Sequence, residues 1–198
     1  HNYNLNRKNT NDINRLINIL DYQANKNMDH AYVVHQRNVY HNVPLWVLIN
    51  TLTYGQISKL YTLLPFQLQS SISKNFSHIK EKPLEQYLKT LTLFRNVCAH
   101  NERLFSFRTQ IDFPDTSLHA KLCIPQKGTQ YICGKRDLFG VVIAFRYLLP
   151  NDSFLNFKHS LIKLMHTYHK LSSQLAKPIL LEMMGFPSNW TSITRYSL

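Results

Sequence analysis

The helix that organises this chain is predicted by residues 84–100, which read LEQYLKTLTLFRNVCAH. Apolar side chains recur there at steps of three and four residues, the spacing of one face of an α-helix. The same spacing continues through Leu104 and Phe105, so we expect a helix of about six turns. Glycine is rare, with five in 198 residues, and similar apolar spacing recurs on both sides. The fold class predicted is therefore mainly α, a helical bundle.

Other segments are predicted around this helix. A first helix is expected from about Asn11 to Lys26, and a polar connection rich in His and Asn follows it as far as Val43. Pro44 then suits the first turn of an apolar helix that is expected to extend toward Tyr54. Helices are expected again at Asp137–Leu149 and Ser153–Lys177.

A small insertion is predicted around residues 109–134. Pro114, Pro125 and Gly128 interrupt the helical spacing there, and the short runs 120–124 and 129–133 indicate extended structure or a β-hairpin.

We expect one domain of 198 residues, because no repeat or shift in composition marks a second. Its parts are an N-terminal helix with a polar connection over 1–43, a bundle core over 44–108 and 135–190, and the insertion over 109–134. The chain begins at His1 rather than Met, so we expect a further N-terminal region in the whole protein.

The charge of the chain predicts a polyanionic partner. Lys and Arg number 23 against 11 Asp and Glu, a net charge of +12 in a sequence with only 17% charged residues. Nucleic acid is the leading candidate, because each cation that neutralises a phosphate releases a counterion. A composition that is simply rich in Asn and Lys is the alternative.

Cysteine usage and hydropathy predict where the protein works. No apolar run reaches the ~18–20 residues of a membrane span, and no signal peptide is visible. The three cysteines, Cys98, Cys123 and Cys133, are odd in number and lack metal-site spacing. We expect a cytoplasmic protein with neither a disulfide framework nor a structural metal.

Polar residues lie close together near the end of the predicted central helix. On a helical wheel centred on Phe94, Asn96, His100 and Arg103 fall at about 200°, 240° and 180°, opposite the apolar stripe, while Arg95 falls at about 100°. Asn96 and His100 are neighbours on this wheel. Arg95 and His100 are about 140° apart, so a single helix does not close both around one phosphate. Two copies packed on their polar faces would bring both pairs together at a two-fold axis.

These residue types suit the cleavage of RNA, in which the 2′-hydroxyl is an internal nucleophile. Histidines, which ordinarily titrate at about pH 6.5, serve as general acids and bases. An arginine guanidinium matches phosphate oxygens as a fork. A solvated helix face, with Arg95 paired to Glu102, is the alternative interpretation of the same residues.

The pattern Arg95-Asn96-Val97-Cys98-Ala99-His100 resembles the Arg-Asn-x-x-x-His signature of HEPN ribonucleases. Further segments, together with this motif, resemble the abortive-infection Abi family of the AbiD/AbiF type; they are 44–50, 53–61, 95–104, 134–139 and 184–190.

The resemblance implies a HEPN-like helical bundle, a bacterial anti-phage or toxin-type role, and RNA as substrate. It also implies association with a small non-coding RNA, as partner or inhibitor. On this basis Arg95, Asn96 and His100 are the expected catalytic residues of a homodimer. The products would be a 2′,3′-cyclic phosphate and a 5′-hydroxyl, without metal or other cofactor.

Several other residues have two interpretations. Basic residues around the insertion form either an RNA clamp or a solvated loop; with Arg103 they are the expected RNA-binding residues Lys121, Lys127, Lys135 and Arg136. Cys98 is expected in the core. Core packing is also expected, ahead of base stacking, for the ring residues Trp46, Tyr54, Tyr61 and Phe66.

Two further patterns can be interpreted as structural or as functional. His166 and His169 suggest half of a metal site, but exposed or RNA-facing histidines are the preferred interpretation. Asp137 is expected to cap a helix.

Two other functions compete with the ribonuclease. One is an RNA-binding module without catalysis, and the other is a structural interaction domain of a defence protein.

Overall fold

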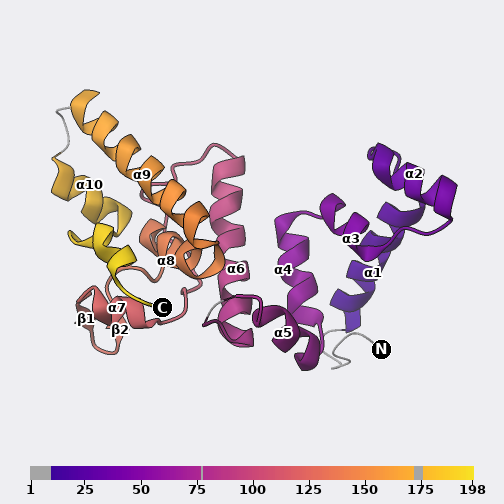
Figure 1. Cartoon of the computed structure of the whole chain (residues 1–198), viewed down its shortest axis with the longest axis horizontal. Helices are drawn as coiled ribbons and strands as arrows, with labels where there is room; N and C mark the ends of the chain where they lie inside the picture. The colour runs from indigo at the N-terminus through magenta and orange to yellow at the C-terminus, as the bar shows by residue number, and fades with distance from the viewer. Residues whose placement is uncertain (1–9, 77, 172–175) are drawn as a thin grey trace. The chain divides into compact units, whose positions relative to one another are not determined.

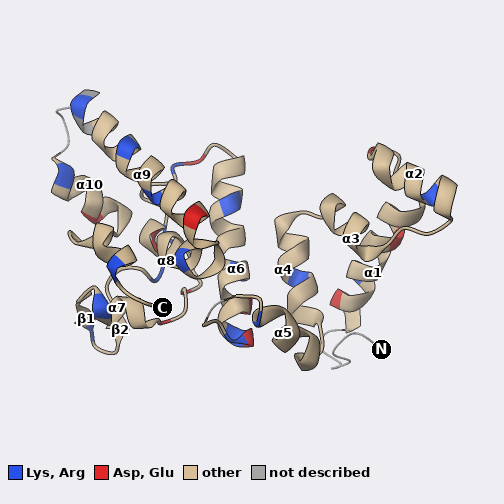
Figure 2. Ribbon diagram, viewed as in Figure 1, with Lys and Arg blue, Asp and Glu red and all other residues tan. Residues whose placement is uncertain are grey.

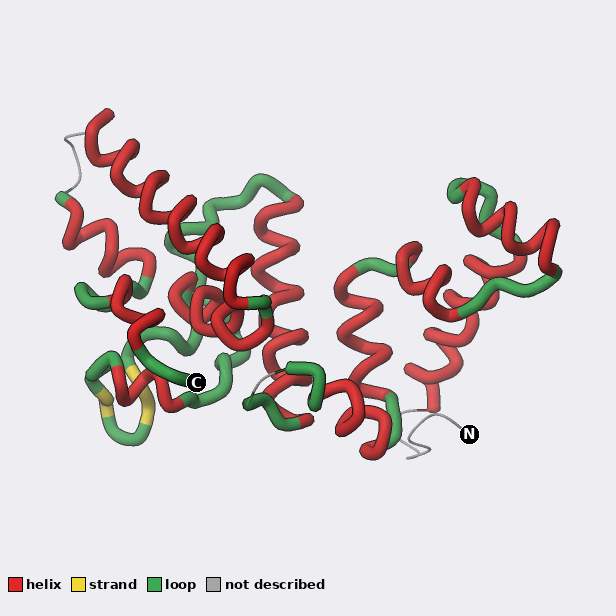
Figure 3. Tube along the Cα trace, viewed as in Figure 1, coloured by secondary structure: helices red, strands yellow, loops and turns green. Residues whose placement is uncertain are grey.

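The computed structural model describes residues 10–76, 78–171 and 176–198. Helices make up most of these residues, and the strands are confined to one short hairpin (Figures 1 and 3). The predicted fold class, mainly α with a small β-hairpin, is therefore confirmed. Two compact units divide the chain, residues 1–71 and 72–198. The single domain expected from the sequence stays a prediction.

The first unit contains α1 to α4 and the start of α5. The bounds are α1 Thr10–Asn25, α2 Ala31–Tyr40, α3 Leu45–Leu48, a 3-10 turn Ile49–Thr51, α4 Tyr54–Leu63 and α5 Phe66–Ser73. Its core joins α1 to α4, because Ile13 and Leu16 of α1 pack with Leu60 and Leu63 of α4. These positions lie three apart on each helix, so each helix buries one stripe.

Helix α2 occupies the segment that we expected to be a polar connection. Its sequence has no apolar stripe, and Val33 is the only buried residue among its described positions. Tertiary hydrogen bonds hold it instead: the Arg37 guanidinium donates to the carbonyl oxygens of Ala24 and Asn27, both at 2.7 Å. The segment is therefore a helix and not a connection. The sequence did not predict this helix because hydrogen bonds, rather than a buried apolar stripe, stabilise it.

The apolar segment after Pro44 is shorter than expected. Helix α3 ends at Leu48 and passes into the 3-10 turn. A new helix, α4, begins after Thr53, which is its N-cap. The Thr53 hydroxyl accepts from the Gln56 N–H, and the Gln56 side chain accepts from the Thr53 N–H at 2.8 Å.

The second unit is built around α8. Its elements are α6 Glu81–Ala99, α7 Ser117–Lys121, β1 Gln126–Lys127, β2 Gln130–Tyr131, α8 Leu138–Leu148, α9 Asn151–Leu171, α10 Lys177–Met184 and a 3-10 turn Trp190–Arg195. Helix α8 is apolar on nearly all sides and is buried along most of its length, between α6 and α9 (Figure 1). The predicted helix Ser153–Lys177 crosses residues 172–175, which lie outside the described residues, and Ala176 is the N-cap of α10.

The insertion contains a helix as well as the hairpin. Ala120 and Lys121, expected in a strand, belong to α7, and strands β1 and β2 pair antiparallel through Gln126↔Tyr131 and Lys127↔Gln130. Helix α7 begins at a capping box in which the Thr116 side chain and the His119 side chain satisfy each other's backbone N–H groups. This local capping overrides the extended character that the sequence suggested.

Candidate active site

The end of α6 is set by a left-handed residue. Helix α6 ends at Ala99, His100 is its C-cap, and Asn101 has φ 54°. The Glu102 N–H donates to the Val97 carbonyl oxygen at 3.0 Å, and the Asn101 N–H donates to that of Cys98 at 3.3 Å. These two bonds form a Schellman motif, and asparagine is one of the few residues besides glycine that accepts its left-handed position.

The three expected catalytic residues share the exposed side of this helix end. Arg95, Asn96 and His100 are all exposed, while Phe94 and Val97 on the opposite side are buried. Within the described part of the chain Arg95 forms no ion pair, so the Arg95–Glu102 pair of the alternative interpretation is absent. The cation and the imidazole are therefore both available to a ligand.

The helical wheel fails beyond His100. Because the helix ends at Ala99, Arg103 does not share a helical face with Asn96; its guanidinium lies over the Phe105 ring at 5.9 Å. Cys98 is exposed, so its expected place in the core was wrong. Between Asn96 and His100 the bond is between backbones: the His100 N–H donates to the Asn96 carbonyl oxygen at 3.0 Å.

The basic residues of the insertion are mostly engaged within the second unit. The Lys135 ammonium pairs with Asp115 at 2.7 Å and also donates to the Phe113 carbonyl oxygen. Arg136 pairs with Asp112, and Lys121 donates to the Ser197 carbonyl oxygen at 2.6 Å. Lys127, on strand β1, is exposed. Of these four side chains, Lys127 alone has no partner among the described residues, and an RNA clamp here stays a prediction.

Two buried ionisable residues stand behind the insertion. Asp137 caps α8 as expected, accepting from the Gly140 N–H at 3.1 Å and from the Gly134 N–H at 3.0 Å. Burial raises the pKa of the Asp137 carboxyl to about 6, although these hydrogen bonds favour the charged form and lower the pKa. His119, which the sequence analysis did not single out, is fully buried, and burial lowers its pKa. Its signal was the spacing Thr116-x-x-His119 of a capping box.

The remaining candidates are a metal site and the aromatic residues that were expected in the core. No group of three His, Cys, Asp or Glu side chains that could hold a metal ion occurs among the described residues, and the His169 side chain lies outside them. Tyr61 is buried as expected, and Tyr54 is partly buried. Trp46 and Phe66 are 69% and 66% exposed, so their expected core packing was wrong.

Basic side chains are distributed over both units rather than gathered in one element (Figure 2). No helix in the described ranges combines the length and the apolarity needed to cross a membrane.

The fold and the site define a mainly helical protein that presents an Arg–Asn and a His at an exposed helix end. Residues 1–106 match the family model described as Abi-like protein, so the chain belongs to that family. The match contains the first unit and the whole of α6 with the Arg95–His100 motif, while segments 134–139 and 184–190 lie beyond it. Comparison with curated proteins and with solved structures gave no match. The family relation indicates a role in abortive infection.

Proposed function

We propose that this protein is a metal-independent endoribonuclease of abortive-infection defence, with a composite site formed by Arg95, Asn96 and His100 of two copies. The observation that carries the proposal is the joint exposure of these three side chains at the end of α6, in the part of the chain that matches the Abi-like family. An arginine and a histidine that have no side-chain partner among the described residues suit metal-independent phosphodiester transfer, because the arginine can bind the phosphate and the histidine can transfer protons.

The proposed reaction uses the RNA's own 2′-hydroxyl. Its oxygen attacks the adjacent phosphorus, the P–O5′ bond breaks, and a 2′,3′-cyclic phosphate and a 5′-hydroxyl result. The His100 imidazole of one copy accepts the 2′-hydroxyl proton and then donates a proton to the leaving 5′-oxygen. The Arg95 guanidinium of the other copy neutralises the charge that grows on the non-bridging oxygens, and Asn96 hydrogen-bonds the phosphate or orients the imidazole.

The test compares cleavage of labelled RNA in EDTA by the wild type, His100→Ala and Arg95→Ala. The control is Lys163→Ala, which removes an exposed cation from α9 in the same unit. We expect the wild type and Lys163→Ala to cut, and the other two variants to lose activity by roughly 10²-fold or more. Cleavage that persists in His100→Ala, or that stops in EDTA, would overturn the mechanism.

A non-catalytic RNA-binding module, bound to a small non-coding RNA, is the second candidate. The net charge of +12 supports it independently of the motif. RNA that co-purifies with the protein but stays uncut by the wild type would favour this module over the ribonuclease.

A further inference from the structure

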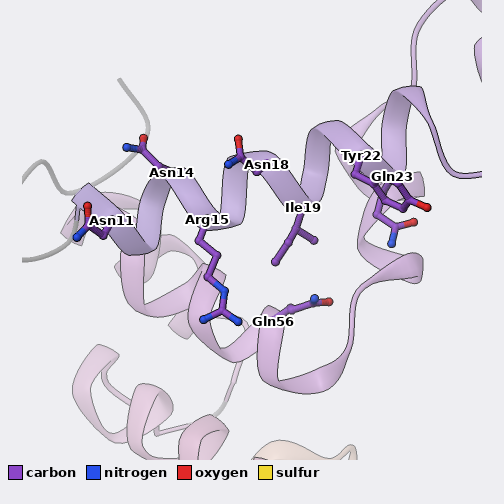
Figure 4. Close-up of a pocket in the computed structure, with 8 residues that line it drawn as sticks. All are labelled: Asn11, Asn14, Arg15, Asn18, Ile19, Tyr22, Gln23 and Gln56. Carbon is purple, nitrogen blue, oxygen red and sulfur yellow. The ribbon is translucent and has the colours of Figure 1, made fainter.

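A pocket beside α1 in the first unit, lined mostly by Asn and Gln residues, has no part in the proposed cleavage. Its volume is about 570 Å³, and it is lined by α1 together with Gln56 in the first turn of α4 (Figure 4). A second pocket of about 370 Å³ shares Arg15, Ile19 and Gln56 with it, so the two hollows adjoin. We call them together the α1–α4 groove.

Side-chain amides dominate one edge of this groove. Asn11, Asn14 and Asn18 follow one another at about one helical turn along α1. All three are exposed, and their amides have no hydrogen-bond partner among the described residues. Each amide offers a donor and an acceptor side by side, the pattern that complements the edge of an unpaired nucleobase.

A single unpaired cation lies on the other edge. Arg15 points from α1 toward Gln56 of α4 (Figure 4). In the adjoining hollow Asp12 is already paired with Lys59 at 2.6 Å. Arg15 has no ion pair within the described residues, so it gives the groove a net positive charge. A guanidinium in this position suits a phosphate.

The remaining lining favours a nucleic acid strand over a protein segment. Ile19 is the only aliphatic side chain among the described residues that line the larger pocket, so this pocket has no row of aliphatic side chains into which the apolar face of a docking helix could pack. Tyr22 is 51% exposed and presents a ring on which a base can stack. In an RNA duplex the Watson–Crick edges are paired, and the deep, narrow major groove keeps the remaining base edges out of reach of side-chain amides.

We propose that the α1–α4 groove binds single-stranded RNA, with the Asn11, Asn14 and Asn18 amides on base edges, Arg15 on a phosphate and Tyr22 stacked on a base. The choice of RNA as the ligand rests on the proposed function. The groove belongs to the first unit, whereas Arg95 and His100 belong to the second.

The first test is the binding of labelled oligoadenylate and oligouridylate to the full chain, measured by fluorescence anisotropy at several salt concentrations. His100→Ala serves as the background, so that the RNA stays uncut. Arg15→Ala is compared with Lys26→Ala, which removes the same charge from an exposed position outside the groove. We expect Arg15→Ala to weaken binding roughly five- to tenfold and to reduce the salt slope by about one. Equal affinities for the two variants would overturn the proposal.

The second test removes the amides and keeps the charge. The double variant Asn14→Ala/Asn18→Ala is compared with Asn38→Ala/Asn42→Ala, whose amides are exposed outside the groove. Alanine has the higher helix propensity, so α1 is expected to fold. We expect the groove variant to bind roughly tenfold more weakly, to lose any preference between the two oligonucleotides, and to keep its salt slope. Unchanged affinity would overturn the role of the amides.

The two proposals fail separately. If the wild type cuts RNA while Arg15→Ala and the amide variant bind normally, the groove proposal fails and the ribonuclease stands. If binding depends on Arg15 and the amides but the wild type never cuts, the groove stands and the ribonuclease fails.

Discussion

A buried carboxylate joins three segments of the second unit. Asp137 accepts hydrogen bonds from the backbone of Gly134 and of Gly140, and Gly185 packs against it so closely that a Cβ there would lie 2.3 Å from its Cγ. Gly185 also has φ 77°, a conformation that glycine adopts without strain. Segments 134–139 and 184–190, which resemble the Abi family in sequence, therefore meet at this side chain.

Replacing Asp137 by alanine should destabilise the protein. The change removes the N-cap of α8 and leaves the buried Gly134 N–H without its acceptor. We expect the free energy of unfolding to fall by about 2–3 kcal/mol, measured by urea denaturation. The control is Glu182→Ala, an exposed carboxylate in α10, which should change it by less than about 0.5 kcal/mol. Equal losses in the two variants would contradict the role of Asp137.

The same carboxylate predicts a pH dependence of stability. Its pKa is about 6 in the folded protein against an ordinary 3.8, so between these values the folded chain binds more protons than the unfolded chain. The Asp137 contribution to the free energy of unfolding therefore falls as pH rises through that window and is constant above it. His119 acts in the opposite sense: its lowered pKa destabilises the fold as pH falls below about 6.5.

Subtracting the Asp137→Asn curve from the wild-type curve isolates the aspartate, because His119 is common to both. The difference in free energy of unfolding, wild type minus variant, should decrease between about pH 4 and pH 6 and then level off. Urea denaturation across this range measures it. A difference that rises with pH would show that the carboxylate is not held in its protonated form.

At the scale of the element, the last turn of α6 depends on Asn101. A β-branched residue is strained in the left-handed conformation that this position has, whereas glycine is not. We expect Asn101→Val to cost about 1–2 kcal/mol of stability and Asn101→Gly to be neutral or slightly stabilising. Because the turn fixes His100 at the C-cap, Asn101→Val should also slow RNA cleavage, and Asn101→Gly should preserve it.

Thermal denaturation and cleavage rates of these two variants make the measurement. Equal stability for valine and glycine would mean that the left-handed turn does not set the end of α6.

Helices with a buried stripe could be predicted from the sequence, and those without one could not. The stripes of α1 and α6 placed both helices near their observed positions. Helix α2 depends on Arg37 hydrogen bonds to residues ten and thirteen positions earlier. Such bonds produce no periodic pattern of apolar residues in the sequence. The apolar Leu104 and Phe105 extended the predicted central helix past its end, since periodicity does not register a left-handed residue between them and His100.

The site shows the same division between local and tertiary information. The exposure of Arg95, Asn96 and His100 follows from the helical wheel, because it depends on one helix. Lys135 and Arg136 pair with Asp115 and Asp112, which lie twenty or more residues away in the sequence. Such ion pairs cannot be predicted from a local sequence pattern. A basic cluster in a sequence thus overstates the free positive charge of the folded surface.

For the whole molecule, the proposed composite site makes the expected activity a property of two copies, because about 140° separate Arg95 and His100 on the helical wheel. Neither Arg95→Ala nor His100→Ala should cut RNA alone. A mixed dimer keeps one Arg95 from the His100→Ala copy and one His100 from the Arg95→Ala copy, so a composite site regains an arginine and a histidine. Free exchange makes up to about half of the dimers mixed.

Cleavage should therefore reappear when the two inactive variants are combined and should scale with the fraction of mixed dimers. Wild type mixed with His100→Ala controls for exchange between copies. The specific activity of the wild type should also fall on dilution below its dimer dissociation constant, as mass action requires. A mixture that stays inert while exchange is demonstrated would mean that each copy carries a complete site. Arg95 and His100 would then have to meet one phosphate from a single helix end, against the angle that separates them.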